Sequence, residues 1–359
     1  GMLAVGIPEY RLPKDALARD IEYILDQGVE LHTGVEVECL DELRREYKAV
    51  FIGTGAQRPR PLGVEGEDLA GVTDTLAFLR EHALGRPPKC GKVVAVVGGG
   101  NAAVDAARTA VRLGAEKVLL LYRRTRAEMT AYPEEITAAL EEGVEMHFLV
   151  APRRVLGKNG RVGGIELTRM ELGETDLDGR RRPVPVPGSE FVVECDMVLP
   201  AIGQIPSVEP IAHSAWPEGI IEKLIEDGRV CVDPRTMQTA AEGLWAGGDC
   251  VTGPATVIKA IAAGQRAAVA IDRHLGGTGD LPPDTGFSLR RPEEDELGPM
   301  PRAREPELPA PERIRTFCEV VACLEESQAL AEARRCLRCD LERRVTRGDA
   351  SRVSAFERR

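Results

Sequence analysis

The residue types that bind a dinucleotide occur together in one segment, residues 93–124. An apolar, β-branched run, Val93–Val97, precedes a glycine turn and an alanine-rich helix pattern. Gly98, Gly100 and Ala103 fit the spacing G-x-G-x-x-A, in which small residues let the backbone approach a pyrophosphate at a helix N-terminus. A lone glycine pattern is a weak signal, but the complete strand–turn–helix unit predicts a Rossmann-like domain.

Two arginine residues follow the next predicted strand. Val118–Tyr122 is apolar, and Arg123 and Arg124 come directly after it, where an NAD-dependent enzyme usually carries an acid. Guanidinium groups pair bidentately with phosphate. The pair therefore favours NADP(H), with its 2′-phosphate, over NAD(H).

Composition limits the class of protein. The chain has 359 residues, a net charge of −11 and a pI near 5.2, which predicts two or three domains and argues against nucleic-acid binding. No apolar run approaches the length of about 18 residues that a membrane span needs. Nine cysteines, mostly scattered singly, indicate free thiols in a reducing cytoplasm. The five scattered histidines suggest neither a triad nor a histidine metal site.

Further elements flank the central unit. Apolar residues at Leu17, Ile21, Ile24 and Leu25 predict a helix that Gly28 closes. Strands are predicted at Val29–His32, Val35–Val37, Ala49–Gly53 and Leu244–Ala246, and a later helix near Ala255. A β-rich excursion is predicted near Arg161–Cys195, with a solvated hairpin loop at Arg180–Arg182. Glu134–Glu135 and Glu141–Glu142 predict the wet face of a helix.

Six motifs carry a resemblance to a known family. They are GIPEYRLPK (6–14), TGA (54–56), GGGNAAVDAAR (98–108), YRR with EMTA (122–131), AIGQIP (201–206) and GGDCVTGPATVIKAIAAGQRAA (247–268). In these the chain resembles the flavin-dependent pyridine nucleotide oxidoreductases related to the small subunit of glutamate synthase. That group includes the amino-terminal part of dihydropyrimidine dehydrogenase and the flavin subunits of ferredoxin:NADP transhydrogenases. The match extends to about His274.

The resemblance implies an α/β fold with two dinucleotide-binding domains, one inserted in the other. The expected boundaries are an FAD-binding part at 1–84, an inserted NAD(P)-binding domain at 85–221, a second FAD-binding part at 222–276, a Pro-rich linker at 277–311 and a helical tail at 312–359. Family members carry an earlier strand–GxGxxG–helix unit for the ADP half of FAD. The first such unit is missing here, so we expect a truncated flavin domain with uncovered apolar sheet surface.

The resemblance also implies site residues. Cofactor contacts are expected on the nicotinamide side from Gly98, Gly99, Gly100, Asn101, Ala102, Asp105, Arg123, Arg124, Thr130, Ala201, Ile202 and Gly203. On the FAD side they are expected from Met2, Arg11, Val37, Thr54, Gly55, Gly248, Asp249, Ala255, Thr256 and Val257. Backbone N–H groups at Ala255–Val257 would face the flavin pyrimidine, where a helix N-terminus stabilises negative charge. Thr130 replaces the proline of the family's EMPA motif.

The C-terminal region offers a further hypothesis. A helix is predicted from Glu325 to about Arg335, and it leads into Cys336 and Cys339 within EARRCLRC, a string similar to one that opens iron–sulfur modules in this family. With Cys318 and Cys323 these thiolates could hold a cluster or a zinc ion. We favour the hypothesis that a partner or a missing downstream domain carries the clusters. A local cluster and a helical tail without metal are the alternatives.

Together these features predict an FAD-dependent NAD(P)H oxidoreductase that passes hydride from NADPH to flavin and electrons on to an iron–sulfur partner, such as a glutamate-synthase-type large subunit. The alternatives are an electron-input subunit of a formate dehydrogenase, hydrogenase or NADH-type complex, and a non-catalytic docking fragment. No pair of redox cysteines adjoins the flavin motifs, which argues against a disulfide relay.

Overall fold

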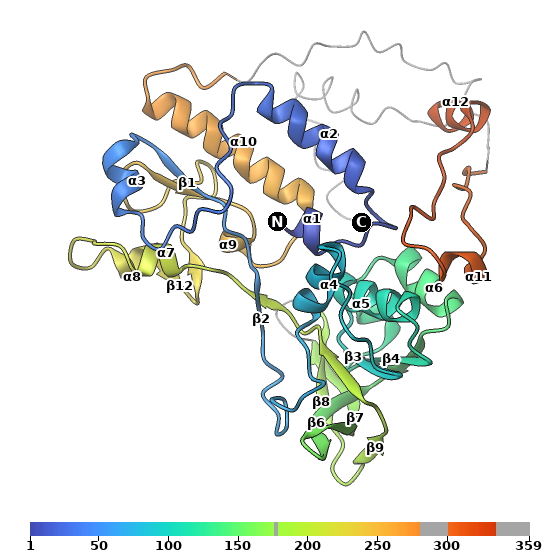
Figure 1. Ribbon diagram of the computed structural model, residues 1–359. Helices are drawn as coiled ribbons and strands as arrows, with labels where there is room; N and C mark the ends of the chain where they lie inside the picture. Colours follow the sequence, from blue (N-terminus) through green and yellow to red (C-terminus); the bar gives the residue numbers. More distant parts are fainter. Residues whose placement is uncertain (176–178, 281–300, 335–359) are drawn as a thin grey trace, which may run out of the picture. The chain divides into compact units, whose positions relative to one another are not determined.

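The computed structural model of the chain describes residues 1–175, 179–280 and 301–334 (Figure 1). The chain divides into two compact units, the first made of Gly1–Asp280 with Pro309–Glu319 and the second of Leu281–Leu308 with Val320–Arg359. None of the helices in the described ranges combines the length and apolar composition that a bilayer span requires.

A parallel four-stranded sheet is the centre of the first unit. Its strand order is β10-β3-β4-β5, formed by Met197–Pro200, Val93–Val97, Lys117–Tyr122 and Glu145–Phe148. The strands predicted at Val93–Val97 and Val118–Tyr122 are confirmed. Since the carboxyl ends of parallel strands share one edge of the sheet, the glycine turn after β3 lies beside the arginines after β4.

The two faces of this sheet have different partners. Side chains alternate between the faces along a strand, so Val94 and Val96 pack with the helices α4 (Thr75–Ala83), α5 (Asn101–Arg112) and α6 (Pro133–Glu141). Ala95 and Val97 face the other way and pack against the antiparallel strands β6 (Val150–Lys158), β7 (Arg161–Thr175) and β9 (Phe191–Val193), with β8 (Arg181–Pro185) pairing with β7. The predicted β-rich excursion is therefore confirmed, and it begins earlier, at Val150.

A second, smaller α/β part is built from segments far apart in sequence. β1 (Val50–Ile52) pairs in parallel with β14 (Leu244–Ala246), which confirms both predicted strands. α10 (Val257–His274) follows β14 and packs against it through Ala263 and Ala267. β2 (Arg58–Pro59) and β11 (Gln204–Ile205) pair where the chain leaves and re-enters this part.

The remaining elements of the first unit are short, apart from one helix. They are α1 (Met2–Val5), α2 (Lys14–Leu25), α3 (Asp41–Glu46), the 3₁₀ turn η1 (Arg126–Glu128), α7 (Glu209–Ala212), α8 (Ile221–Leu224), β12 (Ile225–Glu226), β13 (Arg229–Val230), α9 (Asp249–Thr252) and α11 (Ala310–Arg313). The helix predicted before Gly28 is confirmed as α2.

The strands predicted at Val29–His32 and Val35–Val37 are wrong. These residues are extended but form no strand, and Leu31 and Val35 are 61% and 68% exposed. A strand needs a neighbour to satisfy its backbone N–H and C=O groups, and the sheet of β1 and β14 has only two strands among the described residues. Ile258 on α10 is also 69% exposed, so apolar side chains are exposed in this part of the described structure. The absence of a first flavin-domain unit stays a prediction.

The second unit has one described helix. α12 (Glu326–Arg334) confirms the helix predicted from Glu325. Ahead of it the chain is extended, and the backbone N–H of Leu308 donates to the carbonyl of Val320 at 3.0 Å. Cys336 and Cys339, the predicted cluster ligands, lie outside the described residues.

Candidate functional site

The glycine turn after β3 is shaped by close packing on both neighbouring strands. Gly98 has a φ of +154°, and a Cβ there would overlap the carbonyl oxygen of Ala201 after β10. A Cβ on Gly99 would overlap the ring of Tyr122 at the end of β4. The turn can therefore approach both strand ends only with glycine at these two positions.

The turn presents a row of backbone donors. The N–H of Gly98 donates to Leu121 at 3.0 Å, and that of Ala103 to Gly100 at 3.0 Å. Among the described residues, no acceptor is found for the four N–H groups between them, those of Gly99, Gly100, Asn101 and Ala102. They lie at the N-terminus of the 12-residue helix α5, whose dipole favours an anion. The residues present fit a pyrophosphate.

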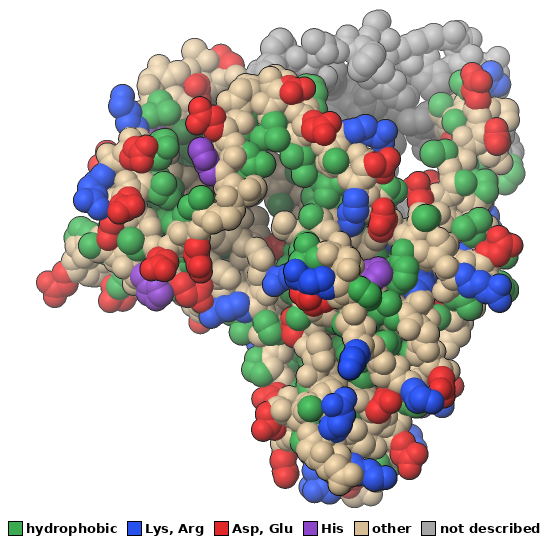
Figure 2. Space-filling model, in the orientation of Figure 1, with side chains coloured by type: hydrophobic (Ala, Val, Ile, Leu, Met, Phe, Trp, Pro, Cys, Tyr) green, Lys and Arg blue, Asp and Glu red, His purple; other side chains and the backbone are tan. Residues whose placement is uncertain are grey.

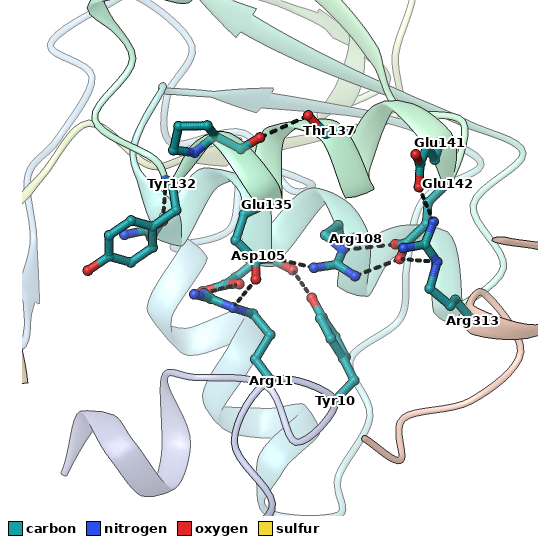
Figure 3. Close-up of polar contacts among 12 residues, drawn as sticks. Tyr10, Arg11, Asp105, Arg108, Tyr132, Glu135, Thr137, Glu141, Glu142 and Arg313 are labelled. Atoms are coloured by element: carbon teal, nitrogen blue, oxygen red, sulfur yellow. Dashed lines mark hydrogen bonds and ion pairs between the residues drawn. The ribbon is translucent and has the colours of Figure 1, made fainter. Parts of the chain in front are cut away.

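A loop before α6 rests on this turn. The backbone N–H groups of Thr130 and Ala131 donate to the carbonyl of Gly99 at 3.0 and 3.2 Å. The N–H of Tyr132 donates to Oδ1 of Asn101 at 3.1 Å (Figure 3). The structure therefore brings the predicted residues Asn101 and Thr130 together, and Thr130 acts there through its backbone.

The two arginines after β4 have different surroundings. Arg123 is exposed. Arg124 is 4% exposed, and its Nε donates to the carbonyl of Arg181 on β8 at 2.7 Å. The hairpin predicted as a solvated loop therefore supports the end of β4. Selection of a 2′-phosphate by both arginines stays a prediction, but only Arg123 has an exposed guanidinium.

This difference gives a testable prediction. Arg123→Ala should weaken NADPH binding about 10- to 100-fold and leave NADH binding unchanged, because a charge-assisted hydrogen bond to phosphate contributes about 1.5–3 kcal/mol. Arg124→Ala should weaken the binding of NADPH and of NADH to the same extent, because it removes the hydrogen bond to the carbonyl of Arg181. Calorimetric titration of each variant with both nucleotides measures this. An equal loss of affinity for NADPH and for NADH in Arg123→Ala would contradict the assignment of Arg123 to the 2′-phosphate.

The residues after β10 complete the nicotinamide side. The N–H of Ala201 donates to Val97 at 2.8 Å, and the carbonyl of Gly203 accepts from the N–H of Arg60 at 3.1 Å. Ile202 between them is 38% exposed. The predicted group Ala201–Gly203 therefore lies directly beside the glycine turn, at the point where the chain crosses into the smaller part.

The predicted FAD-side residues gather around β14 and α10. Oδ1 of Asp249 accepts from the backbone N–H of Ala255 at 3.1 Å, and burial raises the pKa of Asp249 while this hydrogen bond lowers it. The N–H groups of Thr256 and Val257 have no acceptor among the described residues. Gly248 caps α9 with a φ of +76°. Two of the three predicted N–H donors are thus available, and the Ala255 donor is held by Asp249.

Of the four other predicted residues, Thr54 and Gly55 follow β1 and contact the Cys250 thiol beside Asp249, whereas Met2 and Val37 lie elsewhere. The Thr54 hydroxyl donates to the carbonyl of Ser207 at 2.9 Å, and the carbonyl of Gly55 accepts from the Ser207 N–H at 3.4 Å. Met2 is in α1, where its carbonyl accepts from Gly6. Val37 is 39% exposed in the extended segment after α2. The hydrogen bonds of the described residues connect neither Met2 nor Val37 to the rest of the predicted site.

Arg11 and Asp105, predicted as separate cofactor contacts, form an ion pair with each other. Nη1 of Arg11 lies 2.8 and 2.9 Å from the two oxygens of the Asp105 carboxylate, and its Nε lies 2.8 Å from Glu135 (Figure 3). The hydroxyl of Tyr10 donates to the backbone carbonyl of Asp105 at 3.3 Å. The turn at Tyr10–Arg11 is thereby fastened to the second turn of α5.

Burial raises the pKa of Asp105 to about 6, although Arg11 lowers it. The folded state therefore binds a proton more readily than the unfolded state between about pH 4 and about pH 6. The contribution of Asp105 to stability is full below pH 4 and is lost as the pH rises through 6, by up to about 3 kcal/mol. The free energy of unfolding of wild type minus that of Asp105→Asn should fall over this interval, as urea unfolding at several pH values can measure. A difference that is flat or rises would contradict the shift.

The predicted wet face of α6 is wrong at Glu142 and at Glu135, whose side chain is 19% exposed and pairs with Arg11 and Arg108. Glu142 directly follows the helix and is 5% exposed. Its carboxylate accepts from Nε and Nη2 of Arg108 at 3.0 and 2.6 Å and from Nη1 and Nη2 of Arg112 at 2.6 and 3.0 Å. Burial raises the pKa of Glu142, but the hydrogen bonds from these arginines bring it below its usual value. The sequence signal was the spacing of Asp105, Arg108 and Arg112, which places all three on one face of α5.

The described cysteines give no metal site. No group of three or more His, Cys, Asp or Glu side chains in the described ranges could hold a metal ion. Cys250, next to Asp249, is fully buried, and burial raises the pKa of its thiol, so it is not a reactive thiolate.

Three features define the class of dinucleotide-binding α/β oxidoreductases. They are a glycine turn with available N–H groups, a second helix N-terminus after β14, and the antiparallel pair of β2 and β11 at which the chain passes between the two parts. The model of the pyridine nucleotide-disulphide oxidoreductase family matches residues 5–264, and the chain belongs to that family. The predicted two-domain α/β fold is confirmed by solved structures. FprA from Mycobacterium tuberculosis in complex with NADPH superposes with a TM-score of 0.61 at 19% identity, over 77% of this chain and 75% of that one. Thioredoxin reductase from T. acidophilum superposes with a TM-score of 0.55 at 20% identity, over 76% and 86%.

Curated relatives confirm the resemblance to the glutamate synthase group. The chain is 47% identical to the NADP(+)-dependent formate dehydrogenase subunit beta of Moorella thermoacetica, over 94% of this chain and 49% of that protein. It is 43% identical to the NADPH-Fe(3+) oxidoreductase subunit beta of Geobacter sulfurreducens, over 94% and 56%. It is 39% identical to the glutamate synthase [NADPH] small chain of Halomonas elongata, over 77% and 60%. The chain thus spans about half the length of the curated relatives that it matches over most of its own length.

Proposed function

We propose that this chain is the NADP(H)-binding, electron-input part of a flavin-dependent oxidoreductase that delivers electrons to an iron–sulfur partner. The observation that carries the proposal is the row of available N–H groups from Gly99 to Ala102 at the start of α5. The exposed Arg123 after the neighbouring strand supports a nucleotide with a 2′-phosphate.

The residues of the chain would bind the two cofactors and orient their rings. The turn after β3 would hold the pyrophosphate, and Ala201–Gly203 would lie along the nicotinamide arm, since Gly98 packs against Ala201. The FAD-side residues would place Thr256 and Val257 N–H groups against the flavin ring. When bound, the nicotinamide supplies a hydride and the flavin accepts it. Orientation of two rings, rather than a general acid or base, is what such a step requires.

A variant at the first residue of α5 tests the nucleotide site. Asn101→Pro removes one N–H donor, and proline is favoured at the first helical position. The extended conformation of Gly100 (φ −97°, ψ 176°) is compatible with a following proline. Both Asn101→Pro and Asn101→Ala lose the side-chain bond to Tyr132, so their difference isolates the N–H. NADPH should bind about tenfold more weakly to Asn101→Pro than to Asn101→Ala, at equal thermal stability. Equal affinities would refute the site.

The described residues leave apolar side chains exposed on the flavin side. The sheet of β1 and β14 has two strands among the described residues, and apolar side chains such as Leu31, Val35 and Ile258 are exposed. We infer that a preceding strand–turn–helix unit covers this surface and binds the ADP half of FAD. A visible spectrum of the chain after addition of FAD and then NADPH under argon tests this. Bound flavin that bleaches would contradict the need for the unit.

The length of the matches favours one class of acceptor. Coverage of 94% is too high for the alignments to the formate dehydrogenase and NADPH-Fe(3+) oxidoreductase subunits to stop before Pro309–Glu319. The alignment to the glutamate synthase small chain covers 77% and does not require that segment. We therefore favour an electron-input subunit of a multisubunit complex of the first type. A docking fragment without activity would bind neither NADPH nor flavin in the two experiments above.

A further inference from the structure

One guanidinium in the first unit contacts three segments that are far apart in sequence. The Arg112 side chain is fully buried. Nη1 and Nη2 donate to the Glu142 carboxylate, and Nε donates to the backbone carbonyl of Thr316 at 3.0 Å. Its plane lies 4.0 Å over the ring of Tyr10. The end of α5 thus connects the N-terminal turn, α6 and a segment near the C-terminus.

That C-terminal segment, Pro309–Glu319, is called the strap here. It belongs to the first unit, whereas the residues that precede and follow it belong to the second. Arg313 is 3% exposed, forms an ion pair with Glu141 and lies 3.8 Å from Glu142 (Figure 3). The ring of Phe317 lies 3.9 Å from that of His82 on α4. The strap is therefore fastened by charge at one end and by a ring contact at the other.

The N-terminal turn is held by the same helix. Tyr10 is 1% exposed and packs against both Arg108, at 4.7 Å, and Arg112, at 4.0 Å. Arg11, next in sequence, pairs with Asp105. In Figure 3 Tyr10 and Arg11 lie on one side of the buried network and Arg313 on the other, with Arg108 and the carboxylates between them.

A guanidinium has a rigid set of five N–H donors. If the strap left, Nε of Arg112 would lose its acceptor at Thr316, and Glu142 would lose the nearby charge of Arg313. Buried charges that lose a partner reorient or become hydrated. Reorientation of Arg112 would remove one face of the contact on Tyr10.

We propose that Arg112 is a positioning residue that couples docking of the strap to placement of the Tyr10–Arg11 turn. The strap and the turn both belong to the first unit, and both contact α5. A substitution that releases the strap should therefore also loosen the Tyr10–Arg11 turn, and the reverse, since such coupling is reciprocal.

Hydrogen exchange of the full chain tests the coupling without any cofactor. Arg313→Met removes the buried charge of the strap but none of the contacts of Tyr10. We expect amide exchange to become about tenfold faster both in 310–317 and in 8–14. Arg315→Met makes the same substitution at an exposed position of the strap and should change neither segment. Phe317→Ala, which releases the strap without altering charge, should reproduce the result of Arg313→Met.

Faster exchange in the strap alone, in either variant that releases it, would overturn the coupling. So would an equal acceleration throughout β3 and β4, because that would be a general loss of stability. The readout needs neither NADPH nor flavin, so the coupling and the proposed function can fail separately.

Discussion

Replacing Glu142 with glutamine is expected to lower the free energy of unfolding by about 3–5 kcal/mol. The carboxylate is the shared acceptor of Arg108 and Arg112, whose side chains are 2% and 0% exposed. Glutamine has nearly the same size but no charge, and its NH₂ group would point a donor at a donor. Arg108 would keep its ion pair with Glu135, but the buried guanidinium of Arg112 would lack an anionic partner. Urea unfolding at neutral pH measures the loss.

The neighbouring residue provides the control. Glu141 pairs with Arg313, which is buried but keeps the Glu142 carboxylate at 3.8 Å. Because the Glu141 side chain is 52% exposed, solvent screens this ion pair and its contribution is at most about 1 kcal/mol. Glu141→Gln should therefore change stability by less than about 1 kcal/mol. Similar losses of stability in the two variants would contradict the prediction that the buried carboxylate of Glu142 contributes more than the exposed carboxylate of Glu141.

Gly98→Ala is expected to abolish NADPH binding and to destabilise the fold. The added Cβ would overlap the backbone oxygen of Ala201, which cannot move without displacing the end of β10, and the φ of +154° is unfavourable for alanine. Overpacking of this kind costs about 1–3 kcal/mol. The turn would also carry Gly99 and Gly100 away from their positions, so NADPH affinity should fall at least about 100-fold, well beyond the loss of one N–H donor.

Gly264→Ala is the matched control for this change. Gly264 lies within α10, and a Cβ there meets no atom within 4 Å. Alanine is a better helix former than glycine by about 1 kcal/mol, so this variant should be slightly more stable and bind NADPH unchanged. Calorimetric titration and thermal unfolding of both variants decide the outcome. NADPH affinity of Gly98→Ala within threefold of wild type, by about 0.6 kcal/mol or less, would contradict the role of the turn.

Local patterns were sufficient for the nucleotide-binding unit. β3, the glycine turn, α5 and β4 follow one another in sequence, and their apolar periodicity and small residues reflect contacts within about 30 residues. The same holds for α2, β14 and α12, each of which has its own apolar face or helix-forming composition. The glycine spacing also predicted which backbone groups lie together, because a turn between a strand and a helix has few possible shapes.

Strand formation at Val29–His32 and Val35–Val37 depended on neighbours. β-branched composition indicates that a segment can form a strand, but only a second chain segment that pairs with it makes it one. No such partner occurs among the described residues, and the apolar side chains remain exposed.

The sequence by itself determined the fold class, the family and the residues of the glycine turn. Tertiary structure alone decided that Arg124 anchors a hairpin, that Arg11 pairs with Asp105, and that Glu142 is buried. In each case the partner is distant in sequence, as with Arg112 and Thr316, which are separated by 204 positions. The pattern of charged residues along a helix does not indicate whether another segment of the chain covers those side chains. Burial by the strap and the N-terminal turn converts a solvated charge pattern into a buried network with one arrangement of partners.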